Sequence, residues 1–204
     1  MVEKPRQRGR PRSFDPAAAL DSAAELFWAK GFADTSLDDL SAAMGMGRPS
    51  IYNAFGDKGE LFLRALERYG ETTASSPLRA MNDQDSIRGA LDAFFGQIVE
   101  YTTADRAHLG CLLDSVAPVT DIPAARRFVN QNLAETEAQI AERLSAAVRR
   151  GDLPPDYSAE RGARRAVNAI FSLASRARLG ASREELLADA ADATSTVLET
   201  RIGP

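Results

Sequence analysis

The chain contains very little cysteine and histidine, and both shortages exclude functions. Its single cysteine, Cys111, leaves no partner for an intramolecular disulfide and indicates a reducing compartment. Its single histidine, His108, forms only a His-x-x-Cys pair with that cysteine, which is too little for a structural zinc site. We therefore expect no metal site.

Long apolar runs and catalytic signatures are also missing. No stretch approaches the roughly 18 apolar residues of a membrane span, and no apolar signal core lies near the N-terminus. The chain has no G-x-S-x-G, no phosphate-binding loop and no H-E-x-x-H. We expect a soluble, cytoplasmic protein that has no membrane partner, no enzyme activity, no catalytic residue and no cofactor.

What the chain does contain favours helices. Hydrophobic residues make up 44% of its 204 residues, enough to form a core. Alanine, leucine, glutamate and arginine are abundant and have high helix propensity. Because no convincing alternation of β-branched residues is present, we expect an all-α fold of about nine helices. The expected helices span residues 16–30, 37–44, 48–55, 58 onward, 87 onward, 108–116, 123–150, 159–179 and 183–201.

Capping residues fix several of these boundaries. Asp15 precedes Pro16 as an N-cap, and capping boxes of the S/D-x-x-E/D type are expected at three further helix starts. These boxes are Ser36 with Asp39, Asp57 with Glu60, and Ser182 with Glu185. Residues 71–85, which are polar and interrupted by Pro77, read as a junction between domains.

Charge is distributed unevenly along the chain. The net charge is −4, yet residues 1–12 carry five basic residues against one acidic residue. A basic arm on an acidic body is the asymmetry typical of polyanion binding. Arg10 and Arg12, in the RGRPR sequence, could follow a narrow minor groove, or the arm could supply only non-specific attraction. Both interpretations remain open.

Residues 45–62 read GMGRPSIYNAFGDKGELF and predict a short helix, 48–55, closed by glycine at both ends. Ile51 and Phe55 lie four apart and can pack backwards, while the other side chains face outward. A short, rigid helix with an outward polar face suits insertion into the major groove of DNA. The predicted DNA-binding residues are Arg10, Arg12, Thr35, Ser36, Arg48, Pro49, Ser50, Tyr52, Asn53 and Lys58.

The span from Ser13 to Leu63 resembles the N-terminal domain of TetR-family transcriptional regulators. The matching features occur in order: Phe27/Gly31/Phe32, Thr35/Ser36, the Gly45–Gly47 turn, Ile51/Tyr52/Phe55, and Lys58. Gly47 departs from the family pattern, which often has a serine or threonine cap there, and Pro49 is a less usual choice. We therefore divide the chain into a basic flexible arm (1–12), a helix-turn-helix DNA-binding domain (13–58) and a helical effector-binding and dimerisation domain (59–204).

The resemblance implies that the C-terminal domain dimerises and encloses a small-molecule cavity. Small residues in the helices 159–179 and 183–201 are consistent with close packing between subunits, although ordinary intrachain packing would use the same residues. The predicted dimer interface contains Ala166, Ile170, Phe171, Leu173, Leu187, Ala190 and Val197. The predicted pocket is lined by Phe94, Phe95, Ile98, Tyr101, His108, Cys111, Leu112 and Phe128.

The sequence thus predicts a ligand-responsive transcriptional regulator. We expect a repressor that binds a palindromic operator in double-stranded DNA as a homodimer and is released by an unknown small-molecule effector. The alternative is a regulator of the same fold that senses oxidants or electrophiles through Cys111, whose thiolate would be stabilised near a helix start. A lone cysteine is also often a small buried apolar group.

Overall fold

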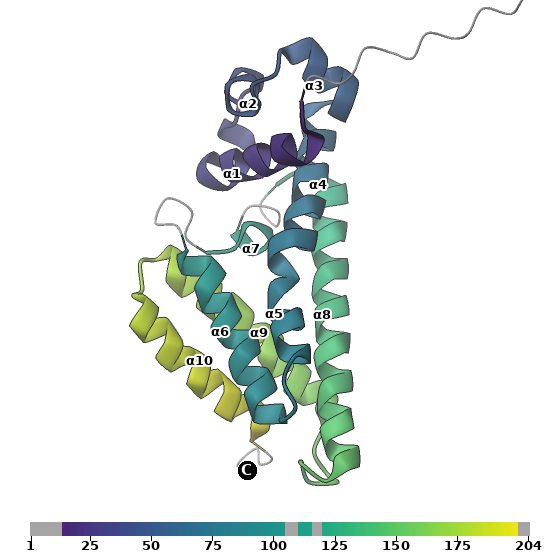
Figure 1. The fold of residues 1–204 in the computed structure, drawn as a ribbon, viewed down its shortest axis with the longest axis vertical. Coiled ribbons are helices and arrows are strands. Elements are labelled where there is room, and N and C mark those ends of the chain that lie inside the picture. The colour runs from purple at the N-terminus through teal and green to yellow at the C-terminus, as the bar shows by residue number, and fades with distance from the viewer. Residues whose placement is uncertain (1–13, 105–109, 116–119, 200–204) are drawn as a thin grey trace, which may run out of the picture.

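The computed structural model describes residues 14–104, 110–115 and 120–199, and every regular element in these ranges is helical. The all-α prediction is therefore confirmed. The molecule is elongated, with α1, α2 and α3 at one end and the long α8 running along the body (Figure 1). The elements are α1 (Pro16–Asp34), α2 (Leu37–Met44), α3 (Arg48–Phe55), α4 (Lys58–Tyr69), the π-helical η1 (Gly70–Ala74), α5 (Ser76–Asn82), α6 (Ile87–Thr103), α7 (Leu112–Ser115), α8 (Pro123–Arg150), α9 (Ala159–Arg178) and α10 (Arg183–Leu198).

The predicted capping groups hold most helix starts. Asp15 Oδ1 accepts a hydrogen bond from the Ala17 amide at 2.9 Å. All three predicted capping boxes are reciprocal, so side chain and backbone satisfy each other at the starts of α2, α4 and α10. In α1 the predicted break is present at Gly31, whose φ of 79° only glycine adopts readily, and one further turn leads to Asp34.

The segment 71–85, which the sequence analysis interpreted as a junction between domains, is largely helical. This segment forms η1 and α5, and α5 packs along α6. Pro77 lies in the first turn of α5, where its missing N–H removes no helical hydrogen bond. Helical structure therefore leads from α4 almost without interruption into the body. The division of the chain into domains stays a prediction.

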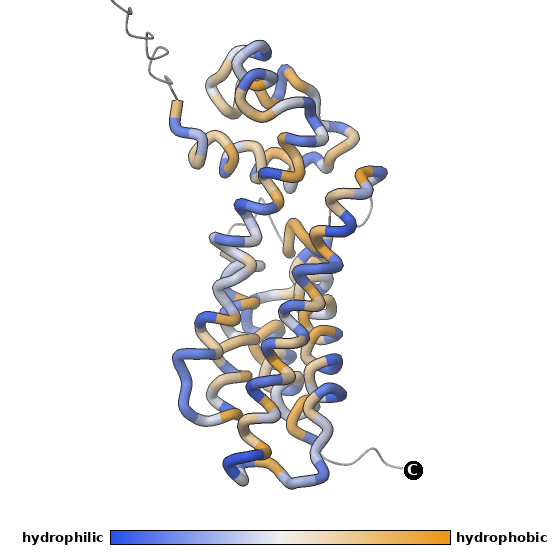
Figure 2. Tube along the Cα trace, turned by 90° about the vertical axis from the view of Figure 1, so that its right-hand side faces the viewer, coloured by the Kyte–Doolittle hydropathy of each residue, from blue (hydrophilic) through white to orange (hydrophobic). Residues whose placement is uncertain are grey.

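Two hydrophobic clusters form the interior. The first joins α1–α4 to α7 and the start of α8, and the second lies among α5, α6, α8, α9 and α10. Apolar and polar segments alternate along these helices, as expected for amphipathic helices around a core (Figure 2). In the first cluster the Phe62 ring lies 4.9 Å from Phe27 and 5.1 Å from Phe32, centroid to centroid. Together with a bidentate pair of Arg68 with Asp21, at 2.8 and 3.0 Å, this packing fixes α1 against α4.

Gly56, which ends α3, provides a test of this local geometry. Its φ of 84° and ψ of −148° are accessible essentially to glycine, and an added Cβ would lie 1.7 Å from Glu60 Oε2. We expect Gly56→Ala to lower the free energy of unfolding by about 1–3 kcal/mol in a urea titration. Gly47→Ala is the control, because Gly47 has a φ of −69° and its nearest neighbour would be 3.8 Å from the new Cβ. Equal losses in the two variants would contradict this assignment.

Candidate DNA-binding surface and ligand cavity

The α3 helix presents one buried and one exposed face. A left-handed Gly45 and the buried Met46 form the turn from α2, and Ile51 and Phe55 are buried behind α3. Tyr52 is 49% exposed on the opposite side. The predicted inward and outward faces are thus confirmed, and this end of the molecule displays a short polar helix. The other exposed side chains on α3 are Arg48, Pro49, Ser50 and Asn53.

Arg48 is held by a neighbour that the sequence analysis did not identify. Its Nε donates to Asp38 Oδ1 at 2.7 Å, and a second contact joins Nη2 to Oδ2. Hydrogen bonding to Asp38 and then the charge of that carboxylate raise the pKa of Arg48. Because both side chains are exposed, the pair contributes little to stability, so Arg48 can exchange Asp38 for DNA at small cost.

Lys58 begins α4 as predicted, but the side chains of Thr35 and Lys58 do not point outward as a phosphate contact requires. Thr35 is 1% exposed, and its hydroxyl donates to the Gly31 carbonyl at 2.6 Å, so its side chain cannot contact phosphate as expected. The Lys58 ammonium lies 4.4 Å from the Phe32 ring centroid and 3.4 Å from the Ala33 oxygen. Desolvation lowers the pKa of Lys58. In this arrangement Lys58 faces the α1–α2 connection, and a phosphate contact requires its flexible side chain to turn outward.

The remaining predicted DNA contacts stand as follows. Ser36 is exposed, but its hydroxyl takes part in the α2 capping box, where it donates to Asp39 Oδ2 at 2.8 Å. Arg10 and Arg12 lie outside the described residues.

Arg64, which the sequence analysis missed, donates to the Ala54 carbonyl at 3.0 Å near the C-terminus of α3. Such contacts between helices, ten residues apart, leave no local signal in the sequence.

A small cavity of about 30 Å³ lies where α5, α6, α8 and α9 meet the segment before α7. Four of the eight predicted pocket residues line it, namely Phe94, Ile98, Tyr101 and Cys111. Phe95 and Leu112 are instead fully buried in the cores, Phe128 packs near Gly70, and His108 lies outside the described residues. The lining residues that the analysis missed are Ala74, Pro77, Leu78, Leu113, Asp114, Asn132, Leu133, Thr136 and Ile170.

Polar groups gather at the α7 side of this cavity. The Tyr69 hydroxyl donates to Cys111 Sγ at 3.8 Å. Cys111 is 3% exposed, and desolvation, followed by the charge of Asp114, raises the pKa of its thiol to about 12. Backbone N–H groups of the short α7 act in the opposite direction but are outweighed. Burial also raises the pKa of Asp114 to about 6, although a hydrogen bond with the Cys111 thiol lowers it.

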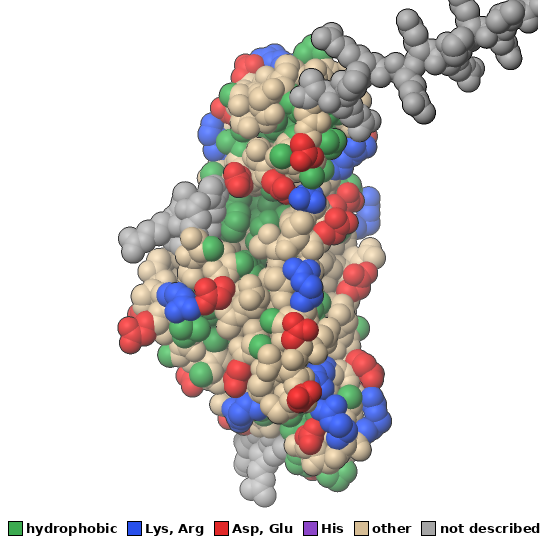
Figure 3. Space-filling view, in the orientation of Figure 1, with side chains coloured by type: hydrophobic (Ala, Val, Ile, Leu, Met, Phe, Trp, Pro, Cys, Tyr) green, Lys and Arg blue, Asp and Glu red, His purple; other side chains and the backbone are tan. Residues whose placement is uncertain are grey.

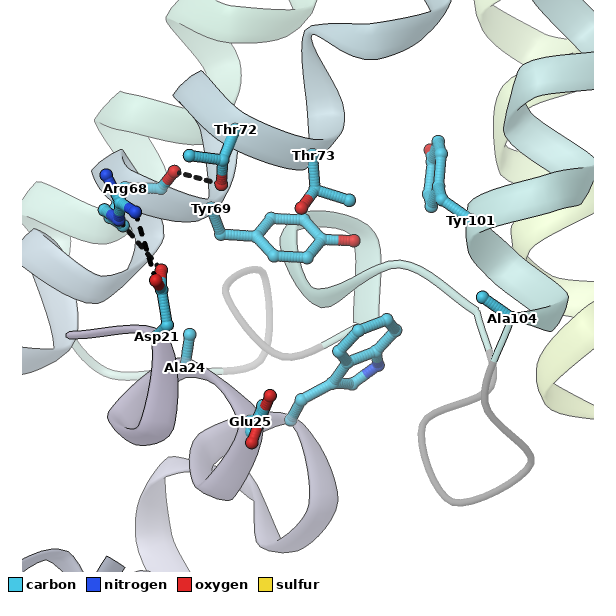
Figure 4. A pocket seen from close by; sticks show the side chains of 10 residues that line it. Asp21, Ala24, Glu25, Arg68, Tyr69, Thr72, Thr73, Tyr101 and Ala104 are labelled. Carbon is cyan, nitrogen blue, oxygen red and sulfur yellow. Dashed lines mark hydrogen bonds and ion pairs between the residues drawn. The ribbon is translucent and has the colours of Figure 1, made fainter. Parts of the chain in front are cut away.

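A larger cleft of about 490 Å³ separates α1 from the body. It is a hydrophobic hollow beneath the α1–α3 end (Figure 3), and the Tyr69 and Tyr101 rings project into it (Figure 4). Tyr101 lines both the cleft and the small cavity. The cleft is bounded by Asp21, Ala24, Glu25, Trp28, Arg68, Tyr69, Thr72, Thr73, Tyr101 and Ala104.

Most of the predicted dimer-interface residues are core residues of one chain. Buried side chains in the second cluster cannot also meet a partner subunit, and this corrects the prediction for Ala166, Ile170, Leu173, Ala190 and Val197. Phe171 on α9 and Leu187 on α10 are each 36% exposed. The small residues in these helices serve close packing against α6, α8 and each other, which is the intrachain alternative.

Within the described ranges, no group of three or more His, Cys, Asp or Glu side chains is arranged to hold a metal ion. Among the helices described, none has both the length and the apolar character that crossing a bilayer demands.

Comparisons with known proteins agree with this geometry. Residues 19–65 match the family profile described as bacterial regulatory proteins, tetR family. Over 187 residues the chain is 31% identical to the HTH-type transcriptional repressor ComR of Escherichia coli K12, covering 89% of this chain and 88% of that protein. It is also 31% identical over 211 residues to the E. coli repressor BdcR, covering 98% and 100% of the two chains.

A solved structure extends the likeness to three dimensions. A CifR cysteine mutant, a TetR-family regulator complexed with 26-bp double-strand operator DNA, superposes with a TM-score of 0.84. The two proteins are 31% identical, and the match covers 92% of this chain and 98% of that one. The likeness therefore includes the body as well as the α1–α3 end.

Proposed function

This chain belongs to the TetR family of DNA-binding transcriptional regulators, and we propose that it is a repressor that binds a palindromic operator as a homodimer and leaves it when a small molecule binds. The observation that carries the proposal is the exposed polar face of α3, held from behind by the buried Ile51 and Phe55. A rigidly backed face of this kind can present side chains to base edges without rearranging the domain.

Relatives support the repressor assignment. ComR and BdcR are named as repressors, and CifR has been solved on operator DNA. One short helix makes few base contacts, whereas two copies spaced about 34–36 Å apart meet successive major grooves on one side of the duplex. Our proposal therefore includes a dimer and a palindromic site, and it includes no catalysis.

The dimer contact is proposed to lie on the outer faces of α9 and α10. Phe171 and Leu187 project there as partly exposed large apolar side chains. We expect the double variant Phe171→Arg/Leu187→Arg to sediment as a monomer in analytical ultracentrifugation. Dimerisation would bury the two introduced guanidinium groups in an apolar interface without a partner, and the cost of their desolvation is large. Tyr52→Ala removes a comparably exposed side chain at the other end of the molecule and should leave the dimer intact. A double variant that remains dimeric would place the interface elsewhere.

Ligand response is proposed to arise at the cleft between α1 and the body. A molecule bound there would contact α1 and α4 together, and a small displacement of α1 would change the spacing of the two α3 helices. The alternative of sensing through Cys111 is disfavoured by its burial and raised thiol pKa, because the thiolate is the reactive form.

The direct test is a mobility-shift assay of the purified protein with the DNA upstream of its own gene. We expect a discrete complex whose affinity falls steeply between 50 and 200 mM salt, since phosphate contacts release counterions. A scrambled duplex of the same composition is the control. Equal binding to both duplexes would argue against an operator-specific regulator.

A further inference from the structure

We infer that the effector is an amphipathic organic cation whose ammonium group pairs with Asp114 and whose apolar body lies in the cleft between α1 and α6. This inference rests on the proposed ligand-responsive function and names the chemistry of its ligand. Three features of the described residues carry it: a carboxylate with one buried oxygen that accepts no hydrogen bond, a cavity lined by no other charged side chain, and an aromatic cleft that shares a wall with that cavity.

The first feature is the Asp114 carboxylate. Its Oδ2 is withdrawn from solvent and has no hydrogen-bond partner among the described residues. Leaving a buried carboxylate oxygen unpaired is costly, and a donor that reaches it recovers much of that cost. Asp114 is also one of the residues that line the small cavity, so its carboxylate lies beside any group that occupies it.

The second feature is the electrostatic character of the cavity. Of the side chains that line it, only Asp114 carries a formal charge. Within the described ranges, the titratable groups that interact with Asp114 are Cys111 before α7, Tyr69 on α4 and Tyr101 on α6, and their raised pKa values keep them neutral. From α8 the cavity receives Asn132 and Thr136 and no base. Among the lining residues that the structure describes, Asp114 is therefore the side chain that attracts a cation.

The third feature is the neighbouring cleft. The cavity alone has room for little more than an ammonium group, since about 10–15 Å³ holds one water. Tyr101 separates it from the cleft of about 490 Å³, which has space for an organic body. Trp28 and Tyr69 line that cleft and pack edge to face at 5.5 Å, and aromatic faces attract cations and apolar groups alike. Figure 4 shows the Tyr69 and Tyr101 rings among the side chains that line the cleft.

This placement links ligand to DNA binding. The cleft is lined by four residues of α1, the helix that packs against α2 at the DNA-binding end. A ligand anchored at Asp114 and extending past Tyr101 therefore touches α1 from the body side. If the ligand binds more tightly to a conformation in which α1 is displaced, that difference in binding free energy shifts the protein away from the operator-binding conformation.

The test uses 2-phenylethylamine as the probe, with 2-phenylethanol and phenylacetate as neutral and anionic analogues. Trp28 is the only tryptophan in the chain, so its fluorescence reports occupation of the cleft directly. We expect the amine to bind at least about tenfold more tightly than either analogue. We expect Asp114→Asn, which keeps the shape and removes the charge, to abolish this preference. Glu25→Gln, which removes a charge from the exposed rim of the same cleft, should preserve it.

The pH dependence is a second readout. A cation prefers ionised Asp114, so amine affinity should be full above the raised pKa and fall as the pH drops through about 6. Tighter binding of phenylacetate at low pH, or equal binding of all three probes, would overturn the inference. The mobility-shift assay without probe is run on the same samples. A protein that binds its operator but shows no amine preference refutes the cationic ligand alone, whereas loss of operator specificity refutes the proposed function.

Discussion

Replacing Arg48 and Tyr52 together by alanine is expected to weaken operator binding by at least about 100-fold in a mobility-shift titration. A good base contact contributes about 1–3 kcal/mol, and a dimer would lose each contact twice. Both side chains are exposed, so the double variant should unfold at the same urea concentration as the unmodified protein. The loss would therefore report recognition and not folding.

Arg149→Ala is the matched control for the lost positive charge. Arg149 is exposed near the C-terminus of α8, where it pairs with Glu142 at 2.7 Å, far along the body from α3. We expect the operator affinity of the Arg149→Ala variant to differ less than about threefold from that of the unmodified protein, because exposed charges away from the duplex are screened by salt. Equal losses in the Arg48/Tyr52 and Arg149 variants would show that overall charge governs binding and that α3 does not read the operator.

Truncating Phe62 to alanine is expected to cost about 3–5 kcal/mol of unfolding free energy. The Phe62 ring is fully buried and packs on Phe27 and Phe32, so its removal leaves a cavity between α4 and α1. This loss is a large share of the 5–15 kcal/mol that stabilises a typical protein. Trp28 lies in the same cluster, and its fluorescence during a urea titration provides the measurement.

Leu179→Ala is the control for Phe62→Ala, because Leu179 is 86% exposed just after α9. Its effect should stay within about 0.5 kcal/mol. If Phe62→Ala were similarly mild, the first cluster would be able to close around the missing ring. The rigid support that we assign to the DNA-binding end would then be wrong.

The DNA-binding end was the most predictable part of this protein. Its boundaries follow from local rules: Ser36 and Asp57 cap helices, Gly45 and Gly56 end them, and each acts on backbone within a few residues. The burial of Ile51 behind α3 follows from its helical spacing alone. Interactions of this kind join residues that are close in sequence, so they can be predicted from the sequence alone.

The pocket and the dimer surface were predicted less well, because both depend on residues far apart in sequence. The sequence pattern around an apolar residue such as Ala166 or Phe95 is the same whether the side chain faces a cavity, a partner subunit or the core. The structure places both residues in the core. No sequence pattern identified Asp114 as a candidate site residue, because its environment is formed by Tyr69, Tyr101 and Cys111, which come from separate elements.

The sequence by itself determined the helical class, the helix boundaries at the DNA-binding end and the outward face of α3, because helix propensity, capping and periodicity act over a few residues. Tertiary structure alone decided that Arg48 pairs with Asp38, that Thr35 is buried and that Asp114 has an unpaired oxygen in a cavity. Each of these depends on which helices pack together, and packing is selected by the free energy of the whole chain.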